Sequence, residues 1–122
     1  MIEIDIRHNL TAFNLNNAMR DRGGKSARSA IKKKMDRDLY YIIRPQIKGK
    51  LEGVYEVEAE WLLPSLNRDL DNLLLKSVFD AMQKGDILIE DNAKHIVKIT
   101  HSYQKVKTKD QGVLIRFKEI VQ

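Results

Sequence analysis

The alternation of apolar and polar residues predicts a short strand at the start of the chain and a long helix after it. Within residues 2–6, isoleucine alternates with charged side chains, the period of two that marks a strand with one buried face. Residues 8–25 are rich in Asn and Gly and are typical of a loop. Residues 26–44 have helical spacing and stop before Pro45. The apolar stripe of this predicted helix comprises Ile31, Met35, Leu39, Ile42 and Ile43.

A second strand and a second helix follow in the middle of the chain. Residues 54–62 alternate strictly, with three glutamates on one face and an apolar set on the other. That apolar set comprises Tyr55, Val57, Ala59 and Trp61. We assign Trp61 to the core, the alternative being a dimer interface. Residues from about 70 to 84 have helical periodicity, and Gly85 is predicted to end that helix in a left-handed conformation.

Three further strands complete the predicted order. They cover residues 87–89, 95–101 and 113–121, and the polar residues 105–111 predict a hairpin connection between the last two. The order is β-α-β-α-β-β-β. We therefore expect one α/β (α+β) domain over residues 1–122, a two-layer sandwich of a mixed β-sheet and two main helices.

Composition excludes several classes of protein. The chain has no cysteine, so it offers no disulfide, thiolate metal site or cysteine nucleophile. Neither a signal-peptide core nor a membrane-spanning apolar run is present, which favours a cytoplasmic protein without a membrane partner. The three histidines lack zinc-site spacing, and no Gly-rich loop predicts a nucleotide cofactor.

Charge is distributed unevenly along the chain. Residues 20–50 contain eleven basic and three acidic side chains, a net charge of +8, so that the remainder carries −3 of the total of +5. A basic region beside an acidic one suits a protein that binds phosphates with one part and a cation with another. The alternative is a solvated basic helix face.

Two acidic clusters follow predicted strands. Asp69 and Asp71 precede the second helix, and in an extended stretch both carboxylates point to the same side. Glu90 and Asp91 follow the short strand at 87–89, so the clusters meet if the strands at 54–62 and 87–89 are close in one sheet. Mg²⁺ prefers such oxygen ligands. The alternative for an isolated Asp-x-Asp is helix N-capping.

One lysine of the second predicted helix also has two interpretations. Lys76 lies one helical turn beyond Asn72 and is the basic residue of this helix that would face a site built from the aspartates. The alternative is a solvated lysine.

These residues resemble a known family, the RusA-type Holliday junction resolvases of bacteria and their prophages. The match spans roughly residues 54–101 and is looser elsewhere, where Asn14 is similar to an Asn-bearing N-terminal segment. The motif residues are RDLDNL at 68–73, Lys76, FDAM at 79–82 and Glu90-Asp91 ahead of a strand. Two features depart from the family pattern: three leucines separate Asn72 from Lys76 where two residues are usual, and Glu90 replaces the first aspartate of an Asp-Asp pair.

The resemblance implies a single endonuclease domain, a crossover junction endodeoxyribonuclease of bacterial or phage-infected cells. Such enzymes are homodimers that bind branched DNA and cut four-way junctions by paired, symmetric, Mg²⁺-dependent nicks in recombination and repair, with Mn²⁺ as a substitute ion. The implied catalytic residues are Asp69, Asp71, Asp91 and Lys76, and the implied metal ligands are the three aspartates with Glu90. The expected DNA-binding residues are Arg68, Asn72, Asn14, Lys25, Arg28, Lys32 and Lys33.

Two other functions fit the same sequence. In the first alternative, the chain is a non-catalytic basic module that binds nucleic acid, and its aspartates only cap a helix. In the second, it is a metal nuclease that acts on flaps or single strands. Cleavage of a synthetic junction separates the first from the enzyme hypothesis, and a comparison of substrates separates the second.

Overall fold

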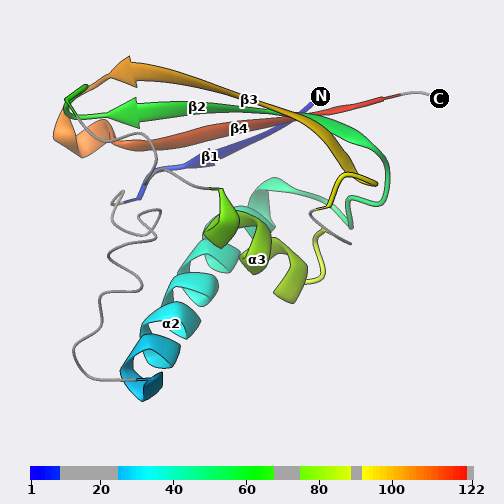
Figure 1. Cartoon of the computed structure of the whole chain (residues 1–122), viewed down its shortest axis with the longest axis horizontal. Helices are drawn as coiled ribbons and strands as arrows, with labels where there is room; N and C mark the ends of the chain where they lie inside the picture. Colours follow the sequence, from blue (N-terminus) through cyan, green and yellow to red (C-terminus); the bar gives the residue numbers. More distant parts are fainter. Residues whose placement is uncertain (9–24, 68–74, 89–91, 121–122) are drawn as a thin grey trace.

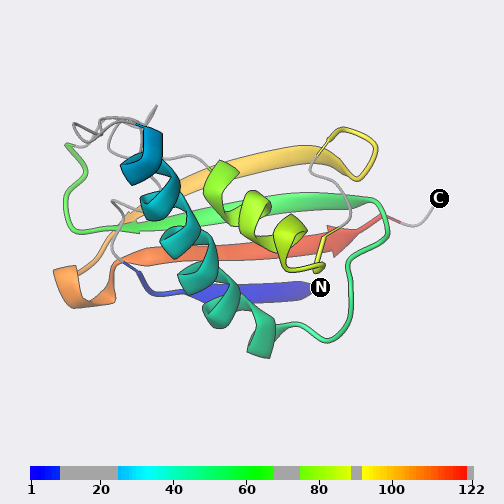
Figure 2. The ribbon, with the colours of Figure 1, turned by 90° about the horizontal axis from the view of Figure 1, so that it is seen from below.

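The computed structural model of the chain describes residues 1–8, 25–67, 75–88 and 92–120, with side chains in the second range from residue 33 onward. Two helices cover one face of a four-stranded sheet and leave its other face open (Figures 1 and 2). The predicted two-layer α+β sandwich is confirmed. The elements are β1 (Ile2–Ile6), α2 (Lys25–Ile43), the 3₁₀ turn η2 (Arg44–Gln46), β2 (Tyr55–Leu63), α3 (Lys76–Lys84), β3 (Ile96–Lys105), η4 (Thr108–Asp110) and β4 (Gly112–Glu119).

Strand β2 lies inside the sheet, whose order is β1-β4-β2-β3. It runs antiparallel to β4 and parallel to β3, and α3 makes the crossover that parallel neighbours need. The predicted hairpin at 105–111 is wrong, because β2 separates β3 from β4. The alternation of apolar and polar residues shows which face of a strand is buried, but it does not show which strands are neighbours. The strand order could therefore not be predicted from this alternation.

Alternation in β2 did predict its buried face. Tyr55, Val57, Ala59 and Trp61 are 0–5% exposed and face the helices, while the three glutamates face away from them. Trp61 is fully buried, which confirms its assignment to the core. The same layer receives the buried faces of β1 and β4, which carry Ile4, Ile6, Val113, Ile115 and Phe117.

The helices close the core from one side. Leu39 and Ile43 of α2 are fully buried, as predicted, and α3 contributes Val78, Phe79, Ala81 and Met82. The ammonium of Lys84 in α3 pairs with the buried carboxylate of Asp36 in α2, which ties the two helices together. Among the described helices, none is long and apolar enough to cross a membrane.

The chain after α3 differs from its prediction. Residues 87–89 were expected to form a strand, but Leu88 makes only an isolated bridge to Leu51, supported by the hydrogen bond from the Leu51 N–H to the Ile87 carbonyl. Ile89 lies outside the described residues, as do the loop residues 9–24 and the first part of the predicted second helix, residues 70–74. A short apolar run is ambiguous between a strand and a buried turn.

Gly85 serves a different purpose from the predicted one. Its φ is −83°, whereas the left-handed residue after α3 is Asp86, with φ 59°. A Cβ on Gly85 would collide with the ring of Tyr40 in α2. The glycine therefore permits close helix packing, a requirement that depends on a residue 45 positions earlier in the sequence.

Gly112, at the start of β4, provides a test of the packing between β1 and β4. Its φ is +156°, and a Cβ there would collide with the carbonyl oxygen of Ile6 and lie 3.0 Å from the Arg7 Cα. We expect Gly112→Ala to reduce the free energy of unfolding by about 2–4 kcal/mol, since both the dihedral strain and the clash fall on backbone. Urea unfolding measures the loss.

Gly49→Ala is the matched control for that experiment. Gly49 also has a positive φ, +73°, but nothing lies within 4 Å of the added Cβ. Only the dihedral cost of about 1–2 kcal/mol then applies. Equal losses in the two variants would contradict the proposed clash with β1.

Candidate active site

The structure describes the frame around the predicted site rather than all of its residues. Lys76 and Lys33 are described with their side chains, and Lys25, Arg28 and Lys32 lie in α2 with only their helical backbone described. Seven predicted site residues lie outside the described residues: Asn14, Arg68, Asp69, Asp71, Asn72, Glu90 and Asp91.

The segment that carries Asp69 and Asp71 connects β2 to α3. Leu63 ends β2 in the core, and beyond Pro64 the N–H of Asn67 donates a hydrogen bond to the Ser65 hydroxyl at 3.3 Å. On the other side Leu75 is buried, and its carbonyl accepts the Phe79 N–H at 2.9 Å. The segment is therefore held at both ends, by the sheet and by the helix.

The start of α3 bears on the capping alternative. Leu75 occupies the N-cap position and makes no side-chain cap, and the first turn contains no acidic residue. In a side-chain cap, an oxygen of the N-cap residue accepts a backbone N–H of the first turn, and the N-cap residue here is a leucine and not an aspartate. This geometry does not assign the aspartates to the N-cap of α3 and leaves them available for other chemistry.

Lys76 is the first residue of α3 and follows that segment directly. Its side chain is 64% exposed, and its Nζ lies 3.6 Å from the Asp80 carboxylate one turn later. The Asp80 side chain is only 18% exposed, but the ammonium itself is largely solvated, so a pair at this distance stabilises the protein little and does not prevent the ammonium from binding a phosphate. The positive end of the helix dipole lies at the same place.

The second acidic cluster is attached near the beginning of β2 and β3. Before it, Leu88 bridges to Leu51 and donates its N–H to the Met82 carbonyl at 3.2 Å. After it, the Asn92 carbonyl accepts the N–H groups of His95 and Ile96 at 3.0 and 2.9 Å. The flanks of residues 89–91 are thus firmly anchored.

These anchors differ from the arrangement expected from sequence. The described flanks of the two clusters lie toward opposite ends of β2, because Asn67 follows its last residue and Asn92 lies near its first (Figure 2). The two clusters were expected to meet if the strands at 54–62 and 87–89 lay close in one sheet. Among the described residues, however, β2 pairs with β3 and β4, and Leu88 bridges to Leu51. Convergence of the carboxylates therefore remains a prediction and no longer rests on neighbouring strands.

The described residues include a basic surface on α2 but no group of side chains that could bind a metal ion. Lys33, Lys34 and Arg37 of α2 are exposed, while Asp36 between them is buried against α3. Within the described ranges, no three His, Asp or Glu side chains are grouped so that they could hold a metal ion. The candidate ligands are the four acidic residues of the two clusters, whose carboxylate oxygens are hard donors that suit Mg²⁺.

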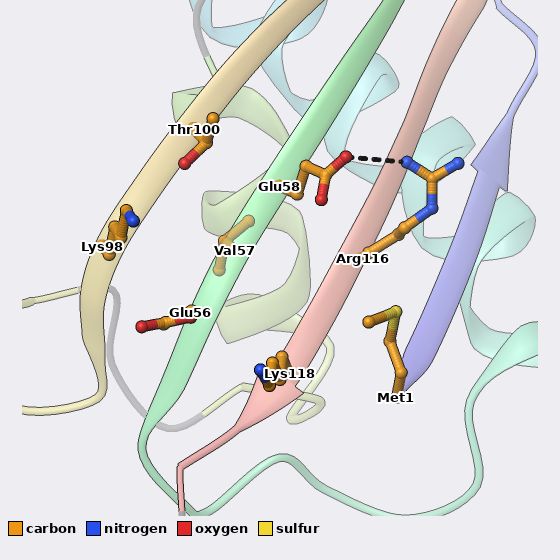
Figure 3. Close-up of a pocket in the computed structure, with 8 residues that line it drawn as sticks. All are labelled: Met1, Glu56, Val57, Glu58, Lys98, Thr100, Arg116 and Lys118. Atoms are coloured by element: carbon orange, nitrogen blue, oxygen red, sulfur yellow. Dashed lines mark hydrogen bonds and ion pairs between the residues drawn. The ribbon is translucent and has the colours of Figure 1, made fainter.

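Sequence reasoning missed one charged site, on the open face of the sheet. A cavity of about 290 Å³ there is lined by Arg116 and neighbouring residues of β2, β3 and β4, together with Met1 (Figure 3). The Arg116 guanidinium donates to Glu3 at 2.9 Å, to Glu58 at 3.2 Å and to Glu60 at 3.3 Å. The hydrogen bond to Glu3 raises the pKa of Arg116 against the opposing effect of burial. Three carboxylates already satisfy this guanidinium, so the cavity is a poor phosphate site.

The motif between β2 and α3 resembles that of RusA-type proteins, and a curated protein of this kind is similar to the chain. The chain is 28% identical over 105 residues to the crossover junction endodeoxyribonuclease RusA of Aquifex aeolicus (strain VF5). The alignment covers 84% of this chain and 80% of that protein, which confirms the resemblance over most of both. No family model matches the chain.

Proposed function

We propose that this chain is a structure-specific DNA endonuclease that resolves four-way junctions in recombination and repair. The observation that carries the proposal is the similarity to a crossover junction endodeoxyribonuclease, which extends over 84% of the chain and so includes most of the fold. The motif Asp69-Leu70-Asp71-Asn72 lies between a buried strand and a helix that begins with an exposed lysine. Paired nicks by a homodimer are part of the proposal.

A divalent metal fits the proposed donor set. Asp69, Asp71 and Asp91, with Glu90 beside them, offer the carboxylate oxygens that Mg²⁺ and Mn²⁺ prefer. When bound, such an ion activates water at neutral pH and offsets charge on a phosphodiester. The chain's own contribution is to hold four acidic residues on two segments whose flanks are fixed by the core.

Lys76 supplies positive charge beside that donor set. Its ammonium is exposed at the first turn of α3, where it would donate hydrogen bonds to a phosphate oxygen or to the leaving oxygen as negative charge develops. Arg68 and Asn72 flank the aspartates in sequence and would orient the same phosphate. These groups position the backbone without reading the bases.

Removing the charge of Lys76 tests its role. We expect Lys76→Met to slow junction cleavage roughly 100-fold at saturating protein, as the loss of one charged donor to a developing oxyanion does. The free energy of unfolding should change by less than about 1 kcal/mol, because the Lys76 ammonium is 64% exposed and lies 3.6 Å from the Asp80 carboxylate. Single-turnover cleavage and urea unfolding measure the two effects.

Lys109→Met, in the turn η4, is the control for Lys76→Met. Lys109 is also exposed but belongs to the connection between β3 and β4. It should cleave at the wild-type rate. A Lys76→Met variant as active as this control would remove Lys76 from the proposed machinery.

The basic face of α2 would bind the arms of the junction. Lys33, Lys34 and Arg37 are exposed on this helix, which also carries Lys25, Arg28 and Lys32. We expect Lys33→Gln to weaken junction binding and to reduce the slope of log K against log salt by roughly 1, as one lost phosphate contact does. Binding isotherms at several salt concentrations give the slope.

Lys118→Gln is the matched control for salt dependence, since Lys118 is exposed on the open face of the sheet, away from the helices. Its slope should equal that of the wild type. A Lys33→Gln slope that also equals the wild-type value would show that α2 does not contact phosphates.

A substrate comparison tests the proposed function as a whole. End-labelled four-way junction, flap and linear duplex are incubated with the protein and Mg²⁺, with and without a chelator. We expect symmetric nicks in the junction that the chelator abolishes. Binding of the junction without cleavage under any divalent metal would identify a binding module instead, and preferential cleavage of the flap would change the substrate.

A further inference from the structure

The outer edge of the sheet is formed by β3, nine of whose ten residues are exposed to solvent. β3 ends the order β1-β4-β2-β3, so within the described part of the chain only β2 pairs with it. After Ile96 every residue of β3 is exposed. Large apolar side chains are among them, with Ile99 43% and Tyr103 39% exposed. An edge of this length and composition invites another strand.

The backbone of β3 has its free polar groups on that edge. The Val106 N–H donates to the Leu63 carbonyl of β2 at 2.8 Å, and successive residues of a strand direct these groups to opposite sides. Counting back from Val106 through the regular part of the strand, Ile99, His101 and Tyr103 direct their N–H and carbonyl groups away from β2. These N–H and carbonyl groups are therefore available to form backbone hydrogen bonds with a further strand.

The side chains of the same residues continue the core to the edge. The register places Ile99 beside Val57 and Tyr103 beside Trp61, on the face that the helices cover further in. His101 lies between them, and its Nδ1 accepts the Trp61 indole N–H at 3.0 Å with the two rings stacked. Apolar surface therefore runs from the core to an uncovered strand edge, which is typical of an interaction site.

We propose that a second copy of this chain pairs with β3 in antiparallel fashion about a two-fold axis through His101, and so joins the two sheets into one. This register sets Ile99 opposite the partner's Tyr103, and symmetry repeats the pair. On the other face it sets Thr100 opposite the partner's Ser102 and Lys98 opposite the partner's Gln104. No like charges face each other.

Self-complementarity is the reason that the occupant is a second copy. Aliphatic residues pair well with aromatic residues across antiparallel strands, whereas like charges directly opposite destabilise. The strand carries both halves of each favourable pair, equally spaced about His101, as an isologous interface requires. The inference deepens the proposed function, on which the choice of partner also rests, because two symmetric nicks need two sites related by a two-fold axis.

Charge substitutions in the 122-residue chain test the register. Sedimentation equilibrium would give the dimer dissociation constant of the wild type, Ile99→Glu, Tyr103→Lys and the double variant. Because each pair occurs twice, we expect either single substitution to weaken the dimer roughly tenfold or more. The double variant should recover most of the affinity, since its new acidic and basic groups face each other across the axis.

Tyr41→Glu is the control, as Tyr41 is exposed on α2 and not on β3. Its dimer should equal that of the wild type, and circular dichroism checks that every variant is folded. A wild-type monomer at high micromolar concentration, or a dimer that the single substitutions leave unchanged, overturns the inference. Junction cleavage is measured separately, so a β3-dependent dimer without cleavage overturns the proposed function and leaves this inference standing.

Discussion

Junction cleavage should fall roughly 1,000-fold when Asp71 is replaced by asparagine. The substitution keeps the size of the side chain and removes one of the charges proposed to hold the metal, which contributes several kcal/mol to the transition state. Binding of the junction should be retained or tightened, because one negative charge beside the phosphates is lost. Single-turnover cleavage in Mg²⁺ and binding in a chelator separate the two effects.

Asp110→Asn controls for the loss of a carboxylate as such. Asp110 is exposed in η4, and it is the backbone carbonyl of this residue that Arg7 binds. This variant should cleave and bind as the wild type does. If Asp71→Asn cleaves within about threefold of Asp110→Asn, then Asp71 does not belong to the metal-binding set.

The second large effect concerns stability and the centre of β2. Trp61 is fully buried in the layer between the sheet and the helices, and its indole N–H donates a hydrogen bond to His101. Trp61→Ala should reduce the free energy of unfolding by about 3–5 kcal/mol, a large part of the 5–15 kcal/mol typical of a domain. Since this is the only tryptophan, unfolding in urea is followed by circular dichroism.

Two variants frame that result. Trp61→Phe keeps an aromatic ring in the same place and should lose less than Trp61→Ala. Tyr41→Ala truncates an aromatic side chain that is 68% exposed and should change stability by less than about 0.5 kcal/mol. A loss below about 1 kcal/mol for Trp61→Ala would contradict the central position of Trp61 in the core.

Residues whose environment is set locally were predictable from the sequence. The period of two in β2 identified Tyr55, Val57, Ala59 and Trp61 as buried, because a strand with one covered face must alternate. Pro45 marked the end of the first helix, which gives way to the turn η2 at Arg44. These features depend on neighbours in the sequence, which a single chain displays directly.

Features that depend on distant residues were not predictable. The insertion of β2 between β3 and β4 is a property of the whole sheet. The requirement for glycine at position 85 comes from the ring of Tyr40, which packs against it. Arg116 was missed because its partners Glu3, Glu58 and Glu60 come from two other strands. Its signal was a basic residue at an outward position of the last strand, while other strands carry acidic residues at theirs.

The candidate site came from the sequence in a different way. The spacing of Asp69 and Asp71 was compatible with either a metal site or a helix cap. The resemblance to the family motif favoured the metal site. The structure adds that Leu75 is the N-cap and that Lys76 opens α3 with an exposed ammonium. How closely the two acidic clusters approach each other depends on residues whose neighbours in space cannot be read from their neighbours in sequence.

The position of β4 has a consequence for how the chain acquires its structure during synthesis. β1 pairs only with β4 among the described strands, and β4 is also the antiparallel neighbour of β2. Among the described strands, β1 therefore gains its partner only after synthesis has continued through β4. A nascent chain that stops short of Gly112 therefore leaves β1 separated from the parallel pair of β2 and β3, because β4 is the strand that lies between them.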